Sequence, residues 1–87
     1  MTMIDIYWEL MVGNKTIETI TELPCVPRVG DSVCVEIDNK KARFSGNICC
    51  VHWITPYKGY YSYRVEISVT VASVEGRRAD KFAKYLK

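Results

Sequence analysis

Residues 61–71 have the sequence YSYRVEISVTV, in which aromatic or β-branched side chains alternate with polar ones. Successive side chains of a strand point to opposite faces, so this period of two is typical of a strand with one buried and one solvated face. Half-buried strands of this kind are common in antiparallel sheets. The stretch therefore predicts a long antiparallel strand. Its core-facing side chains would be Tyr61, Tyr63, Val65, Ile67, Val69 and Val71.

Three stretches nearer the N-terminus also carry strand signals. Residues 4–12 alternate in the same way, and Gly13-Asn14 directly after them suits the positive φ angles of a tight hairpin turn. Residues 16–23 are rich in β-branched side chains, which favour a strand, although their apolar residues fall three apart as in a helical turn. Residues 32–37 alternate again after a loop that contains two prolines. We predict a strand for each stretch, the first burying Ile4, Ile6, Trp8, Leu10 and Val12.

Residues 42–54 predict a further strand, the fourth along the chain, whose alternation is broken. Ile48, Val51 and Trp53 would all suit a core, yet Ile48 has the opposite parity to the other two. A β-bulge at residues 49–50 would bring the apolar side chains to one side and bend the strand. A kink of this kind is what a small, strongly curved barrel needs.

The chain ends in a different pattern, because Ala79, Phe82, Ala83 and Leu86 have the spacing of one face of a helix. The resulting prediction is a mostly-β fold. We expect either a five-stranded curved antiparallel sheet or a small SH3-like barrel, with one short C-terminal helix. A chain of 87 residues is long enough for one core, so residues 1–87 form a single domain in this prediction.

Composition places the chain among ordinary globular proteins, with 48% hydrophobic and 25% charged residues. Its apolar runs are far shorter than the roughly 20 residues of a transmembrane helix. The first residues have no positively charged region followed by an apolar one, so they do not resemble a signal peptide. These observations favour a cytoplasmic protein that does not act at a membrane.

The four cysteines, Cys25, Cys34, Cys49 and Cys50, have no CxxC spacing. Neighbouring Cys49 and Cys50 would point to opposite faces of a strand, which is a poor arrangement for one tetrahedral zinc ion. In a reducing compartment such residues behave as small hydrophobes. We therefore expect buried free thiols, no metal and no cofactor.

An enzyme is not expected either. The single histidine, His52, shares strand parity with Cys50, but no carboxylate follows at a spacing that would orient the imidazole. The glycines are scattered singly, so no phosphate-binding loop is formed. Asp31 follows Gly30 and has the residue type that bonds backbone within a turn.

Two segments carry a resemblance. Residues 23–33, LPCVPRVGDSV, and residues 46–53, GNICCVHW, resemble a Pro-x-x-Gly-Asp-x-Val loop followed by a Gly-x-Val-x-x-Val-x-Trp strand. This pattern occurs in small, mostly uncharacterised bacterial and phage proteins with SH3-like barrels, and the match covers about a third of the chain. The resemblance implies a prokaryotic or phage accessory protein that acts by binding. Inhibitors of host defence encoded by phages are commonly of this size.

Charge is divided unevenly along the chain. Residues 1–40 hold seven acids and three bases, giving −4, whereas residues 41–87 hold nine bases and three acids, giving +6 and the overall +2. Such a division can give one acidic and one basic surface. Over the whole chain the bases exceed the acids by only two, and the pI is near 8.4. Both values argue against a strongly basic nucleic-acid-binding domain.

Aromatic and basic residues gather at residues 57–64, and tyrosine is enriched in binding interfaces because it is large, rigid and amphipathic. We predict a protein-binding surface here, formed by Tyr57, Lys58, Tyr60, Tyr61 and Arg64. The alternative is a nucleic-acid-binding barrel, in which the tyrosines stack on bases. The C-terminal helix would then contribute Arg77, Arg78, Lys81 and Lys84, which would also suit an acidic partner.

The expected partner is a larger host protein or complex, with nucleic acid as the second possibility. Residues 16–23 are our candidate for an edge strand, since Pro24 follows them directly. An edge offers unpaired backbone groups to a partner strand or to a second copy in a homodimer.

Overall fold

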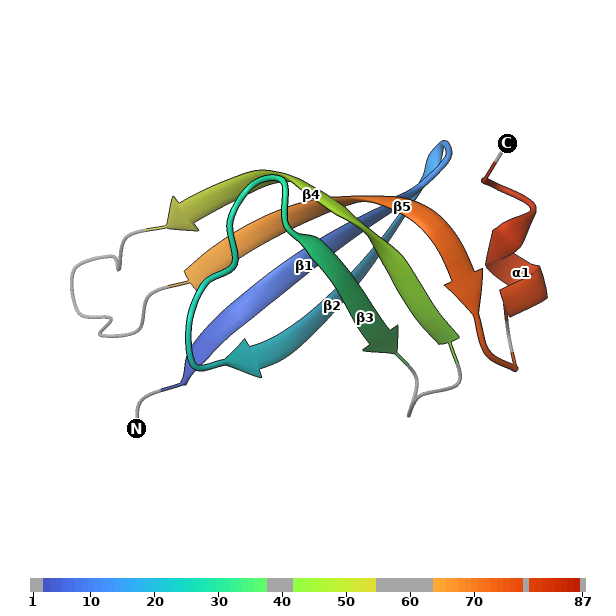
Figure 1. Ribbon diagram of the computed structural model, residues 1–87. Helices are drawn as coiled ribbons and strands as arrows, with labels where there is room; N and C mark the ends of the chain where they lie inside the picture. The colour runs from blue at the N-terminus through green and yellow to red at the C-terminus, as the bar shows by residue number, and fades with distance from the viewer. Residues whose placement is uncertain (1–2, 38–41, 55–63, 78, 87) are drawn as a thin grey trace.

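The computed structural model describes residues 3–37, 42–54, 64–77 and 79–86, with the backbone alone at residues 64 and 83 (Figure 1). Most of these residues are in strands, and one short helix lies near the C-terminus. The elements are β1 (Ile4–Val12), β2 (Lys15–Leu23), β3 (Ser32–Ile37), β4 (Ala42–Ile54), β5 (Arg64–Glu75) and α1 (Ala79–Ala83).

The strands form one curved sheet in the order β2-β1-β5-β4-β3 (Figure 1). A mostly-β, five-stranded fold with one short C-terminal helix is therefore confirmed, and residues 16–23 belong to a strand rather than to a helical turn. The sheet is mixed, however, because β1 and β5 run parallel while the other three pairings are antiparallel. The expectation of an antiparallel sheet was wrong at this pairing. Alternation reports which face of a strand is buried and carries no information on the direction of its neighbour.

The core lies on the concave face of the sheet and confirms the predicted faces of β1 and β5. Ile6, Leu10 and Val12 of β1 are fully buried. From β5, Val65, Ile67, Val69 and Val71 are buried in the same cluster, whereas Tyr61 and Tyr63 lie outside the described residues. Trp8 is 4% exposed, and its indole Nε1–H donates to Oγ1 of Thr21 at 2.7 Å. That bond satisfies a polar group which would otherwise be costly to bury.

Strand β4 contains the predicted bulge. Its register with β5 shifts between Ile48 and Cys50, so Ile48 is buried and Val51 packs against the same core. A second shift lies between Ser45 and Gly46. A Cβ at Gly46 would overlap the carbonyl oxygen of Thr70, which means that β4 approaches β5 more closely there than a side chain permits.

Helix α1 and the residues after it close one end of the core, as the figure shows (Figure 1). The ring of Phe82 meets that of Phe44 edge to face, with centroids 5.1 Å apart. Tyr85 and Leu86 also pack against the core. The backbone of Tyr85 lies against Gly13 in the hairpin turn, so closely that a Cβ at Gly13 would overlap the Tyr85 carbonyl.

The cysteines correct one expectation, because all four are exposed free thiols rather than buried ones. Cys25 lies in the loop after β2, and Cys34 lies on β3 at the edge of the sheet. Cys50 is opposite Ser68 on the convex face, and Cys49 is the extra residue of the bulge, with Sγ 3.4 Å from the Ser68 carbonyl oxygen. Their small size fitted a core, but beside the three strand cysteines the core face is taken by Val35, Ile48 and Val51.

Within the described residues, no helix has the length and hydropathy needed to cross a membrane.

Candidate docking surface around Trp53

The loop between β2 and β3 forms the rigid part of the candidate site. The backbone N–H of Arg28 donates to Oδ2 of Asp31 at 2.9 Å, and the N–H of Asp31 donates to the carbonyl of Arg28 at 3.0 Å. Gly30, between them, has a φ of 94°, which an L side chain rarely adopts. The predicted role of Asp31 in its turn is therefore confirmed.

The same loop is tied to β4 at the bulge. The N–H of Gly30 donates to the carbonyl of Ile48 at 2.8 Å, and the N–H of Ile48 donates to the carbonyl of Asp31 at 3.0 Å. The side-chain amide of Asn47 reaches the Gly30 carbonyl at 3.4 Å. These bonds extend the β3–β4 ladder into the loop and fix its backbone at residues 30–31.

An apolar patch lies where this loop meets the end of β4. We call it the Trp53 patch. It surrounds an open hollow of about 320 Å³ lined by Val26, Pro27, Arg28, Val29, Val51 and Trp53. Val29 is 61% exposed and Trp53 is 52% exposed. Among the described residues, four large hydrophobic side chains are exposed, and two of them are in this patch.

Trp53 is thus a surface residue, although its parity suited the core. It lies opposite the buried Val65 and on the same side of the sheet as Val51. Val51, two residues earlier, packs against the core, whereas Trp53 lies close to the end of β4, where cover on this face is incomplete. Parity predicted the direction of the side chain correctly, but burial also requires something on that face to pack against.

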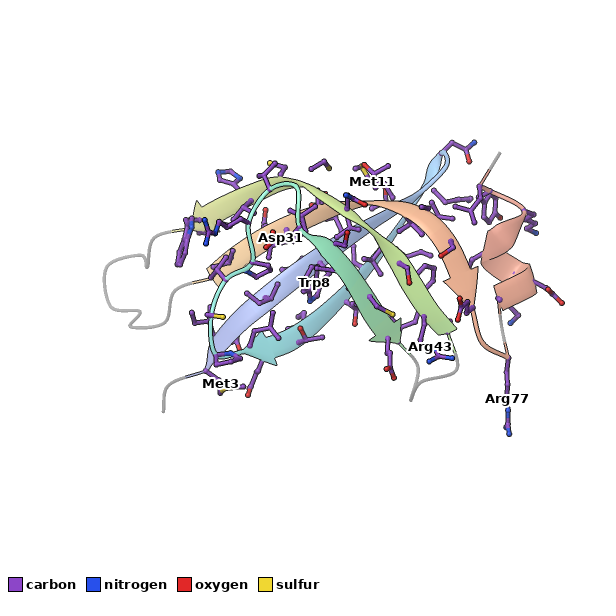
Figure 2. The ribbon with its side chains drawn as sticks, in the orientation of Figure 1. Met3, Trp8, Met11, Asp31, Arg43 and Arg77 are labelled. Atoms are coloured by element: carbon purple, nitrogen blue, oxygen red, sulfur yellow. The ribbon has the colours of Figure 1, made fainter. Side chains whose placement is uncertain are left out.

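A larger open groove continues from the patch toward the edge of β2, with a volume of about 610 Å³. Trp8 contributes to its wall, together with Leu23, Val26 and Val33, and Figure 2 shows Trp8 inside the curve of the sheet. Arg28 and Asp31 add charge, and both are exposed. The groove therefore offers an apolar surface with a polar margin.

Reactive groups are not gathered at this site. Cys25 and Cys34 both line the groove as exposed thiols, while Cys50 and His52 are exposed on the convex face of the sheet. In the part of the chain that is described, no cluster of three or more Cys, His, Asp or Glu side chains could hold a metal ion.

Most of the predicted tyrosine site falls outside the described residues, namely Tyr57, Lys58, Tyr60 and Tyr61. Arg64 begins β5, with its backbone opposite Ile54 of β4 and Asp5 of β1. The Trp53 patch directly precedes this segment in the sequence. Sequence reasoning did not single out Val29 and Trp53 as exposed apolar residues, and the nearby tyrosines were the signal that could have drawn attention to Trp53.

The predicted basic site lies at the other end of β5. Arg77, Lys81 and Lys84 are exposed in and around α1, and Arg78 is outside the described residues. Figure 2 shows Arg77 extending away from the sheet. Trp53 lies opposite Val65 at the beginning of β5, whereas α1 follows Glu75 at the end of that strand, so the Trp53 patch and these bases lie at opposite ends of β5. Lys84 Nζ also lies 5.2 Å from the centroid of the Tyr85 ring, which gives that base a packing role.

Comparison of the chain with known protein families, with curated proteins and with solved structures finds no match.

Proposed function

We propose that this protein is a non-enzymatic protein-binding module that docks through the Trp53 patch and the adjoining groove. The observation that carries the proposal is the exposure of Val29 and Trp53 on a loop and strand end fixed by backbone hydrogen bonds. Isolated exposed hydrophobic residues need no explanation, but a tryptophan and a valine around one hollow are what a binding surface requires.

Rigidity strengthens the argument. Binding costs free energy when a flexible loop must become ordered, and a loop already held by hydrogen bonds avoids most of that cost. Tryptophan is also among the residues that contribute most to interface affinity. The partner we propose is a larger protein or complex of a host cell. A role as a phage accessory protein or inhibitor of host defence is supported by the motif resemblance alone.

The test is affinity capture from a bacterial lysate, followed by calorimetry with each purified partner. Trp53→Ala should weaken binding of the true partner by about a hundredfold, as expected of a central interface tryptophan. Met3→Ala is the matched control, because Met3 is also an exposed large hydrophobic residue, at the start of the described chain. Equal affinities for the wild type and Trp53→Ala would reject this surface.

Nucleic-acid binding is the second candidate function, favoured by the exposure of Arg77, Lys81 and Lys84 at one end of the molecule. Neutralising phosphates releases counterions, so such binding must weaken steeply as salt rises. Titration with random-sequence single-stranded DNA and RNA at several salt concentrations tests it. Tight, salt-sensitive binding lost in Lys81→Ala/Lys84→Ala would favour this function over the first.

A further inference from the structure

Strand β2 forms one edge of the sheet, and among the described residues no strand pairs with its outer side. Val12 and Lys15 flank the two-residue hairpin turn and face each other in the register. The two residues that flank such a turn form a hydrogen-bonded pair, in which the backbone N–H of each donates to the C=O of the other. Along an antiparallel ladder, hydrogen-bonded pairs alternate with pairs that are not hydrogen-bonded. The odd-numbered residues of β2 therefore bond to β1. The backbone N–H and C=O groups that point outward from the sheet belong to Thr16, Glu18, Ile20 and Glu22, and no described strand pairs with them.

Side chains of this same set lie on the convex face. Each of the four is exposed, whereas Ile17, Thr19, Thr21 and Leu23 are partly buried on the other face. Ile20 is 61% exposed, with Glu18 and Glu22 two residues away on either side. The free edge thus presents an acid, an apolar residue and an acid at alternate positions.

Neighbouring β1 makes the edge more acidic. Asp5 is directly opposite Glu22, and Glu9 is directly opposite Glu18. Like charges placed opposite each other destabilise a sheet. Tyr7 offsets part of this charge repulsion, since its hydroxyl donates to Oε2 of Glu18 at 2.6 Å. The hairpin therefore keeps four carboxylates together on its convex face at some cost in stability.

We propose that β2 pairs with an extended segment of another protein in which two basic residues flank an apolar one at alternate positions. Side chains directly opposite across a strand pair are about 5 Å apart, so the two bases would meet Glu18 and Glu22. The apolar residue would meet Ile20. A pattern of base, any, apolar, any, base reads the same in both directions and fits a parallel or an antiparallel strand.

A second copy of this chain fits the edge less well. The outward-facing positions of β2 are Thr16, Glu18, Ile20 and Glu22, and none is basic. Self-pairing would place each carboxylate opposite an acid, an isoleucine or a threonine. The four side chains at this edge lie on the convex face of the sheet, whereas the Trp53 patch and its groove lie on the concave face, so this inference does not depend on the proposed function.

The probe is a labelled peptide of sequence STKTLTKTS, compared with STETLTETS in which both bases are replaced by acids. We expect the basic peptide to bind saturably and to shift the amide NMR signals of Thr16, Glu18, Ile20 and Glu22. Glu18→Gln/Glu22→Gln should weaken binding by about tenfold, since it removes two charged cross-strand pairs. Ile20→Pro should abolish it, because proline removes a free edge N–H without removing a bond to β1.

Asp5→Asn/Glu9→Gln is the matched control, because it removes the same charge from β1 and leaves the edge intact. It should weaken binding by less than about threefold, since these groups are one strand spacing farther from the peptide. Trp53→Ala should bind the peptide normally, which separates this edge from the docking surface. The proposal is wrong if the acidic peptide binds equally well, if no peptide binds, or if sedimentation shows a dimer that Ile20→Pro abolishes.

Discussion

Gly46 lies where the backbone of β5 is too close to β4 for a side chain, beside the first of the two register shifts. The space for a side chain at this position is occupied by the carbonyl of Thr70, which is backbone and cannot turn aside. Gly30 is different, because its φ of 94° is unfavourable for other residues while the space around it is open. One glycine is required by packing and the other by backbone conformation.

Gly46→Ala should therefore lower the free energy of unfolding by about 3 kcal/mol, as expected for an overpacked site that can yield only through backbone movement. Urea denaturation measures the change. Gly30→Ala should lower the free energy of unfolding by only about 1 kcal/mol, because the alanine would have an unfavourable φ angle but no steric clash. A smaller loss for Gly46→Ala than for Gly30→Ala would contradict the close approach of the two strands.

At the scale of elements, α1 depends on tertiary packing rather than on its own helical propensity. Five residues are too few for a stable isolated helix, since nucleation is unfavourable. Two contacts hold it in place: Phe82 packs against Phe44, and the backbone of Tyr85 packs against the hairpin turn at Gly13. The N–H of Tyr85 also bonds to the Phe82 carbonyl at 3.0 Å, which continues the chain in a turn after the helix.

Phe82→Ala should release α1 and lower the free energy of unfolding by about 2 kcal/mol, below the value for a fully buried phenylalanine because Phe82 is only half-buried. Thermal unfolding followed by circular dichroism measures it. Lys81→Ala changes an exposed neighbour on the same helix and should stay within about 0.5 kcal/mol of the wild type. Equal melting temperatures for Phe82→Ala and the wild type would show that α1 does not cover the core.

The molecule as a whole separates its charges. Convex-face carboxylates gather on the β1–β2 hairpin, while Arg77, Lys81 and Lys84 surround α1. This agrees with the division of charge along the sequence, because the acidic half builds the hairpin and the basic half ends in the helix. The exposed Val29 and Trp53 lie apart from both, at the Trp53 patch.

Replacing Glu22 by glutamine should increase the free energy of unfolding by about 0.3 kcal/mol, because it removes repulsion with Asp5 directly opposite. Denaturant titration at low ionic strength measures the gain. At about 1 M salt the gain should disappear, since the Debye length is then only about 3 Å. A loss of stability at low salt would mean that Glu22 has a favourable partner that outweighs Asp5.

The sequence predicted the strands, the hairpin turn, the bulge and the terminal helix. These features depend on side-chain period and on residues with restricted or permissive backbone angles, which are local properties. It also predicted β2 as an edge from the proline that follows. The candidate site was harder to predict, because Trp53 looks like a core residue in the sequence and Val29 lies in a loop without a strand or helix pattern. Only the described end of β4 and its loop show that they are exposed.

Three features were decided by tertiary structure alone. The parallel pairing of β1 with β5 joins segments more than 50 residues apart, and no local pattern specifies such a partner. Exposure of the cysteines and of Trp53 depends on what covers each face, which distant residues provide. The alternation of residues 61–71 determined which side of β5 faces the core wherever that strand is described. Its neighbours, their directions and the surfaces left open were fixed by packing, because burial is a property of the whole fold.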